Sequence, residues 1–110
     1  MKVLSLEQGD IVLLRFPFSN QIDYKIRPAL VVSNNGHNKS SDCWFCPITT
    51  KKAKRCISIE KHLAEGKLDR KSFARTDVIA TMDKDSALKK IGKVRQEKIN
   101  EIRQKLKEHL

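Results

Sequence analysis

Residues 9–35 decide the fold of this chain, and they read GDIVLLRFPFSNQIDYKIRPALVVSNN. A Gly-Asp turn signal opens the stretch, and residues 11–18 after it are rich in β-branched, leucine and phenylalanine residues, which favour a strand. Pro17 indicates that this strand ends there or lies at a sheet edge, because proline donates no ladder hydrogen bond. Residues 19–25 are polar and predict a loop. Residues 29–32, an apolar run after Arg-Pro, predict a second, buried strand.

The rest of the chain continues this alternation of short strands and loops. Four further segments are expected to form strands: residues 43–48, 56–59, 72–82 and 90–94. Residues 61–66 predict one helical turn closed by a glycine, and residues 83–89 predict a capped turn.

The C-terminal segment has the pattern of an amphipathic helix. Ile99, Ile102, Leu106 and Leu110 recur at helical spacing, and lysine, arginine, glutamate and glutamine fill the other face. Such a helix covers a sheet or the end of a barrel. We therefore expect a mainly β chain with a C-terminal α-helix, a small SH3-like barrel formed as one domain over residues 1–110.

The chain is strongly basic. It carries 23 Lys and Arg against 13 Asp and Glu, a formal net charge of +10. Such a charge attracts polyanions, nucleic acids among them, but many of these lysines also suit the solvated face of a helix. No apolar run approaches the roughly 20 residues that span a bilayer, and the first residues lack the apolar core of a secretory signal. We expect a cytoplasmic protein without a membrane partner.

Three cysteines, Cys43, Cys46 and Cys56, argue against a disulfide framework because their number is odd. Cys43 and Cys46 form a C-x-x-C pair, and Cys56 with His37 or His62 would complete a zinc site. Residues three apart on a strand point to opposite faces, which suits chelation poorly. Buried structural thiols, and no metal site, are therefore expected.

Three blocks of the sequence resemble one known family. Residues 9–34 carry GDIV, FPF and KIRPALVVSN, residues 47–50 read PITT, and residues 72–79 read SFARTDVI. In order and spacing across residues 9–83, they resemble the MazF/PemK toxins of bacterial and archaeal toxin–antitoxin pairs. The resemblance implies a barrel of the PemK/MazF/CcdB type, a homodimer, and a small acidic antitoxin as partner.

The same resemblance implies sequence-specific cleavage of single-stranded RNA, such as mRNA, without a metal. The ribose 2′-OH attacks the adjacent phosphate, and the products are a 2′,3′-cyclic phosphate and a 5′-OH end. This chemistry needs a base for the 2′-OH, cations or donors for the charged phosphorane, and an acid for the leaving oxygen.

By resemblance, Arg27 is the main catalytic arginine, because its guanidinium can hold two phosphate oxygens at once. Its structural alternative is an ion pair with Asp10 or Asp23. Thr49 matches a family threonine or serine that donates its hydroxyl to a phosphate oxygen. Thr50 takes its place if the register differs by one residue, and the alternative is that threonine simply favours strands.

Arg75 and Asp77 are two residues apart on a predicted strand and are expected to share a face. The cation would lower the pKa of the aspartate, so that Asp77 acts as base while Arg75 stabilises charge or serves as acid. The alternative is a surface salt bridge. Some family members have a histidine in the loop before the catalytic arginine, and residues 19–26 have none. Asp77 is therefore the best candidate for a base whose identity stays open.

Aromatic rings stack unpaired bases, lysines follow phosphates, and an amide can recognise a base edge. On these grounds the expected RNA-binding residues are Phe18, Asn20, Tyr24, Lys25, Thr50, Lys51 and Lys52. Two other functions stay open: a non-catalytic RNA-binding barrel, and a CcdB-like gyrase inhibitor. The chain ends in KEHL at residues 107–110, without the aromatic residues that a gyrase inhibitor uses, which counts against the second.

Overall fold

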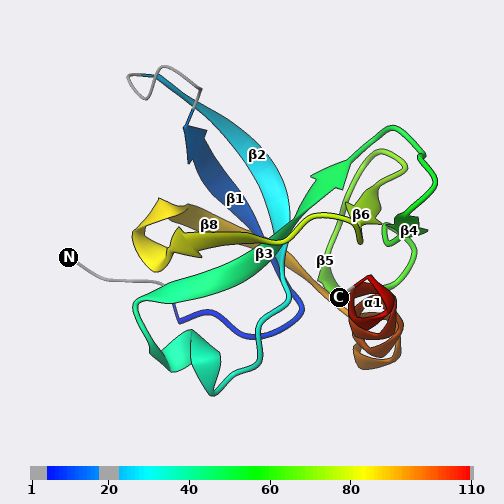
Figure 1. The fold of residues 1–110 in the computed structure, drawn as a ribbon. Helices are drawn as coiled ribbons and strands as arrows, with labels where there is room; N and C mark the ends of the chain where they lie inside the picture. Colours follow the sequence, from blue (N-terminus) through cyan, green and yellow to red (C-terminus); the bar gives the residue numbers. More distant parts are fainter. Residues whose placement is uncertain (1–4, 18–22, 110) are drawn as a thin grey trace.

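The computed structural model describes residues 5–17 and 23–109 of the chain (Figure 1). Its elements in chain order are β1 (Asp10–Pro17), β2 (Tyr24–Val31), η1 (His37–Lys39), β3 (Asp42–Thr49), β4 (Cys56–Ser58), β5 (Leu63–Gly66), β6 (Phe73–Arg75), β7 (Ala80–Asp83), η2 (Lys84–Ser86), β8 (Ala87–Val94) and α1 (Gln96–Glu108). Among these residues, no helix is long and apolar enough to cross a membrane.

The strands form one curled antiparallel sheet in the order β4-β6-β3-β2-β1-β8-β5, and β7 pairs with β3 beside this path (Figure 1). Because the edge strands β4 and β5 do not pair with each other in the described part of the chain, the sheet does not close. The prediction of a mainly β, barrel-like chain with a C-terminal helix is confirmed.

The curled sheet buries two separate apolar clusters, one on each face of the central strands. The first holds Ile11, Leu30, Val32, Cys46, Ile48, Ile57, Ile59, Ala74, Val94, Ile99, Ile102 and Leu106. The second holds Leu6, Val12, Leu14, Ala29, Val31, Cys43, Phe45 and Ala87. Cys43 and Cys46 thus lie in different clusters, as strand alternation predicts for residues three apart.

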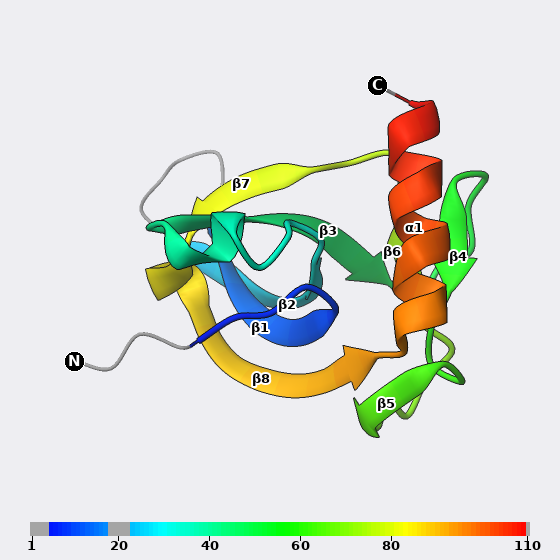
Figure 2. The same ribbon diagram turned by 90° about the horizontal axis from the view of Figure 1, so that it is seen from below.

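Helix α1 closes the first cluster and runs alongside the end of the sheet that carries β4 and β6 (Figure 2). Ile99, Ile102 and Leu106 are buried on its inner face, as the helical spacing predicts, whereas Leu110 lies outside the described residues. Burial of this stripe against the sheet is what fixes the helix, because isolated helices of this length are marginal in water.

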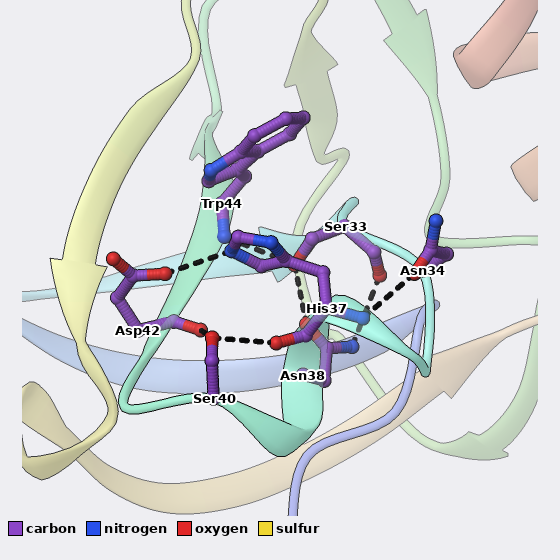
Figure 3. A network of polar contacts seen from close by, with 7 residues as sticks. All are labelled: Ser33, Asn34, His37, Asn38, Ser40, Asp42 and Trp44. Carbon is purple, nitrogen blue, oxygen red and sulfur yellow. Dashed lines mark hydrogen bonds and ion pairs between the residues drawn. The ribbon is translucent and has the colours of Figure 1, made fainter.

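The connection between β2 and β3 is held by a polar network at the end of β3 that lies away from β6 (Figure 3). His37 Nε2 lies 2.7 Å from Asp42 Oδ1, and its ring packs against that of Trp44, tilted by 45° with the centroids 4.9 Å apart. The buried Asn38 side chain donates to the Ser33 carbonyl at 3.0 Å, and Ser33 Oγ in turn accepts the Trp44 amide. Satisfying the buried polar groups fixes this loop.

Two segments differ from the sequence prediction because of how strands pair. Residues 61–66 contain strand β5 instead of a helical turn. Gly66 has a positive φ of 78°, but it pairs with Gly92 of β8, and a Cβ there would lie 2.3 Å from the Ile91 carbonyl oxygen. Glycine is therefore needed for close strand contact and not for a helix end.

Residues 72–82 form two strands instead of one. β3 pairs with β7 over residues 42–45 and with β6 over residues 48–49, so the chain turns between the two strands. The predicted loop at residues 19–25 is also shorter than expected, because β2 already begins at Tyr24, opposite Pro17 of β1. Likewise β8 begins at Ala87 and not at residue 90.

Candidate active site

A cleft of about 660 Å³ opens on the surface between β2 and β3. Its lining residues are Phe16, Pro17, Lys25, Arg27, Pro28, Pro47, Ile48, Thr49, Thr50, Lys51 and Arg75. Four of them are cations, two carry hydroxyls, and this lining contains no carboxylate and no histidine. The cleft therefore suits an anionic ligand.

The cleft exists because the β2–β3 ladder ends early. The pairing of β2 with β3 stops at Ala29 opposite Pro47, although both strands continue beyond this pair. The amide of Val32, just after β2, donates to the Trp44 carbonyl at 2.9 Å, so every second residue toward the start of β2 turns its amide toward β3. The first of these is Leu30, which still pairs with Cys46. The second is Pro28, which has no N–H to donate. The strands diverge from that point, as the central ribbons of Figure 1 show.

Pro47 is accommodated by a second gap in the ladder. It lies between the part of β3 that pairs with β7 and the part that pairs with β6, where no donor is required. Together with Pro17 at the end of β1, all three prolines of the chain line the cleft. The fixed φ of proline makes these walls stiff before any ligand arrives.

The β1–β2 ribbon positions the first two cations. Lys25 pairs with Phe16 and Arg27 with Leu14, so all four side chains project from the same face of the ribbon. Leu14 belongs to the second apolar cluster, and Phe16 packs against it. Lys25 and Arg27 therefore stand beyond the edge of a fixed core and are exposed toward the cleft. The alternative in which Arg27 pairs with Asp10 is wrong, because Asp10 instead binds Lys90 Nζ at 3.0 Å.

Thr49 lies on the opposite wall, at the end of β3. Its Oγ1 accepts the backbone N–H of Lys51 at 3.1 Å. This bond fixes the side chain and uses the hydroxyl as an acceptor, so the hydroxyl proton stays available for a phosphate oxygen. Thr50 and Lys51 extend the same wall.

Arg75 reaches the cleft from β6, and Asp77 holds it there. Arg75 Nε donates to Asp77 Oδ1 at 3.2 Å and Nη2 donates to Oδ2 at 2.9 Å, a two-point pair. The sequence placed both residues on one strand. The structure ends β6 at Arg75 and places Asp77 in the turn that follows, so the contact is made by the turn and not by strand alternation.

The pair shifts both titrations in the expected directions. The hydrogen bond from Arg75 lowers the pKa of Asp77, with a smaller contribution from the charge of Arg55, and that same bond raises the pKa of Arg75. Asp77 is therefore ionised at neutral pH, as predicted, but as a weak base, and Arg75 is a poor acid.

Of the predicted RNA-binding residues, Lys25, Thr50 and Lys51 line the cleft, whereas Tyr24 and Lys52 do not. Tyr24 points to the opposite face of the ribbon from Lys25, where the guanidinium carbon of Arg15 lies 4.5 Å from its ring centroid. The predictions for Phe18 and Asn20 fall outside the described residues.

The sequence prediction did not include five lining residues: Phe16, Pro17, Pro28, Pro47 and Ile48. Each lies within a block already singled out, and two of them, Pro28 and Ile48, directly adjoin the candidate catalytic residues Arg27 and Thr49. The prolines could have pointed to these lining residues, because two of the prolines interrupt stretches that otherwise resemble central strands.

The cysteines lie outside the cleft lining, and Cys43 and Cys46 are buried. Burial raises the pKa of Cys43, and it raises that of Cys46 to about 12. Within residues 5–17 and 23–109, no three His, Cys, Asp or Glu side chains are grouped so that they could hold a metal ion.

Known structures share this architecture. The MazE–MazF complex of Deinococcus radiodurans, in its second crystal form, superposes with a TM-score of 0.76 at 22% identity, covering 96% of this chain and 95% of that one. An endoribonuclease from mycobacterial species gives 0.70 at 22% identity over 99% and 94%. A mycobacterial endoribonuclease bound to its cognate antitoxin gives 0.71 at 23% identity over 96% and 92%.

A search of curated proteins finds no match. The family model of the PemK-like, MazF-like toxins of type II toxin–antitoxin systems, in contrast, matches residues 7–110, which include β1 to β8, α1 and every residue that lines the cleft. The chain therefore belongs to the PemK-like, MazF-like toxin family of type II toxin–antitoxin systems.

Proposed function

We propose that this toxin is an endoribonuclease that cleaves single-stranded RNA, mRNA included, in the cleft between β2 and β3. One observation carries the proposal: the cleft gathers Arg27, Thr49 and Arg75 from three different strands into a basic hollow. Structures of similar fold described as endoribonucleases support it. Four cations around an open cleft also favour a nuclease over a CcdB-like gyrase inhibitor.

The reaction is transfer of the phosphoryl group to the neighbouring ribose oxygen. The 2′-OH loses its proton as its oxygen forms a bond to phosphorus, and the bond to the 5′ oxygen breaks as that oxygen takes up a proton. The products are a 2′,3′-cyclic phosphate and a 5′-OH end. The phosphorane between them carries additional negative charge. Arg27 and Arg75 supply forked donors to its oxygens, and the Thr49 hydroxyl supplies a third, which lowers the barrier most where charge develops.

Asp77 suits a positioning role better than the role of base. Both of its oxygens are occupied by Arg75, and the pair lowers its pKa, so it accepts a proton weakly. An ionised carboxylate that holds a guanidinium in place keeps Arg75 aimed at the phosphate without a further conformational cost. The cations of the cleft also favour ionisation of the attacking 2′-OH.

We also propose the partners that this family implies: a second copy of the chain and a small acidic antitoxin. The structures of MazE–MazF and of the mycobacterial endoribonuclease with its antitoxin support the second. A net charge of +10 attracts an acidic protein, and such complementarity speeds association.

The test is cleavage of mixed RNA by the purified chain in the presence of EDTA, with the new ends mapped chemically. We expect 5′-OH ends at a recurring sequence. Arg27→Ala lowers the rate about 10²–10³-fold, the usual effect of removing one transition-state donor. Arg27→Lys keeps the charge but loses the fork and stays impaired. Lys89→Ala, on β8 outside the cleft lining, serves as the control.

Intact RNA at high protein concentration, with the fold verified by circular dichroism, would leave the non-catalytic RNA-binding barrel as the function. Products with a 5′-phosphate would instead exclude 2′-OH attack while keeping a nuclease.

A further inference from the structure

A second basic hollow, of about 200 Å³, lies where the 50–55 loop meets the C-terminal end of α1. Its lining residues are Lys54, Arg55, Cys56, Ile57, Thr76, Lys105, Glu108 and His109. Within residues 23–109, three permanent cations thus face one lining carboxylate, Glu108, which is itself paired with Lys105 at 3.5 Å. Neither the family resemblance nor the cleft accounts for this cluster.

The hollow is held by backbone contacts. The amide and the hydroxyl of Thr76 both donate to the Arg55 carbonyl, each at 2.8 Å. Thr76 is buried, so the end of the basic loop is fastened to the turn after β6. On the other wall, Leu106 is buried in the first cluster and holds the last turn of α1 in place. Lys54, Arg55 and Lys105 therefore project from fixed backbone.

The hollow and the cleft are neighbours. The loop that joins β3 to β4 begins at Thr50 in the cleft and ends at Arg55 in the hollow. Cys56 in the hollow pairs across the β4–β6 ladder with Arg75 in the cleft, so the two side chains share a face. The charge of Arg55 also acts on Asp77, the partner of Arg75. A ligand strand that leaves the cleft past Arg75 meets the hollow next.

We propose that this hollow, hereafter the flanking site, binds the phosphate backbone of the RNA segment that extends beyond the cleaved bond. The inference rests on the proposed function of the cleft and adds to it a direction in which the substrate continues. The flanking site suits the regularly spaced charges of a polyanion. It offers no apolar platform for stacked bases, because Ile57 is buried in the first cluster and Cys56 is half-buried.

The charges that line the flanking site determine how strongly it contributes to RNA binding. Glu108 and the negative end of the α1 dipole oppose an anion, whereas Lys54, Arg55 and Lys105 attract it. Contacts remote from the reacting phosphate hold substrate and transition state equally, so they lower KM and leave kcat unchanged. Each phosphate contact with single-stranded RNA adds about 0.7 to the salt slope, which is the steepness with which the logarithm of the binding constant falls with the logarithm of the salt concentration.

The test uses RNA oligonucleotides that contain the cleaved sequence and are extended one nucleotide at a time, on the 5′ side or the 3′ side. We expect KM to fall with extension on one side only. In the double variant Lys54→Glu/Lys105→Glu this fall disappears, and the salt slope for the long RNA decreases by about 1.4. The matched control is Lys67→Glu/Lys107→Glu, which has the same change in net charge. Lys107 is two residues from Lys105 and faces away from it on the helix.

A variant of opposite sign separates this role from a folding defect. Glu108→Gln removes the one carboxylate that lines the flanking site among the residues that the structure describes, so the long RNA should bind more tightly while the melting temperature changes little. Equal effects of Lys54→Glu/Lys105→Glu and its control, or equal effects on both extension series, would overturn the proposal. The proposal would also be overturned if Lys54→Glu/Lys105→Glu bound an acidic peptide more weakly but kept its KM for RNA. That result would assign the surface to a protein partner.

A second measurement does not need cleavage. A long RNA with a 2′-deoxy nucleotide at the attack position should slow alkylation of Cys56, the half-buried thiol of the flanking site, whereas a short one should not. Protection without cleavage of ordinary RNA would keep the flanking site and reject the nuclease. Cleavage without protection by the long RNA would reject the flanking site alone.

Discussion

At the scale of single residues, the cleft is organised by groups that carry little chemistry of their own. Pro28 ends the β2–β3 ladder because it lacks the amide that the next pair requires. Phe16 joins the cleft to the second apolar cluster. Asp77 fixes Arg75 through two hydrogen bonds. Of the candidate catalytic side chains, Arg27 is exposed and Arg75 is half-buried, and both are long and flexible, so their placement depends on these neighbours.

Asp77→Asn separates the two roles considered for this residue. A general base typically contributes about 10²–10⁴-fold to the rate, so loss of a base would reduce kcat by that range. We expect a smaller loss, because the amide oxygen still accepts one hydrogen bond from Arg75. The measurement is the pH–rate profile of both proteins. A profile of unchanged shape supports positioning, and loss of an acid limb in the variant would assign Asp77 as the base.

The candidate catalytic residues Arg27, Thr49, Arg75 and Asp77 could be named from the sequence because they lie in blocks that resemble a family. Their contacts could not. The Arg75–Asp77 pair was expected from strand alternation, yet the strand ends at Arg75. Tyr24 and Lys25 were both expected to bind RNA. Adjacent residues on a strand point to opposite faces, and the sequence placed these two in a loop, where that rule does not apply.

At the scale of elements, the molecule depends on strands that change partners. β3 is paired with β2 on one side and with β7 and then β6 on the other, and Pro47 lies at the change. The short strands β4 and β6 have only three residues each, so contacts outside the ladder must hold them. Glu60 supplies one, because its Oε2 accepts the Ser58 hydroxyl at 3.1 Å and the Ser72 amide at 3.2 Å.

These contacts predict an acid-sensitive region around β4 and β6. Burial acts to raise the pKa of Glu60, but hydrogen bonds from the Ser72 amide and the Ser58 hydroxyl hold it below the ordinary value of 4.5. A carboxylate with a lowered pKa stabilises the fold fully above its unfolded pKa, and this contribution is lost as pH falls through the folded value. We expect Glu60→Gln to lower the melting temperature at pH 7 and to lower it less at pH 3.

Melting followed by circular dichroism across this pH range tests the prediction, and Glu65→Gln, an exposed residue of β5, is the control. An equal decrease at both pH values would mean that the ionised form of Glu60 contributes nothing.

Elements were predictable where one local pattern decides them. The helical spacing of Ile99, Ile102 and Leu106 and the apolar runs of β1 and β3 are such patterns. β5 and the division of residues 72–82 were not, because they depend on partners distant in sequence. Strand β5 exists because β8 offers it an edge, which no property of residues 61–66 reveals.

At the scale of the whole molecule, two cores share one curled sheet. Central strands contribute alternate residues to each cluster, as Leu30 and Val31 of β2 do. Neither cluster can open without breaking strands that the other needs. We therefore expect the chain to unfold in one cooperative step, as small domains usually do.

Thiol chemistry tests this expectation. In the native protein at pH 8, a thiol reagent should react rapidly with the half-buried Cys56 and slowly with Cys43 and Cys46, which lie in different clusters. As urea is added, Cys43 and Cys46 should become reactive with the same midpoint as the loss of circular dichroism. The control is Cys56→Ser, which removes the rapid phase. Separate midpoints for Cys43 and Cys46 would show that the two clusters open independently.

The early end of the β2–β3 ladder has a consequence for the behaviour of the protein in a crowded solution. An interrupted ladder leaves strand edges, and such edges invite other chains to add themselves and aggregate. Here the first open position is occupied by Pro28, which cannot donate, and the cations Lys25 and Arg27 precede it on the same strand. The sheet can thus stay open for a nucleic acid while it discourages addition of another strand.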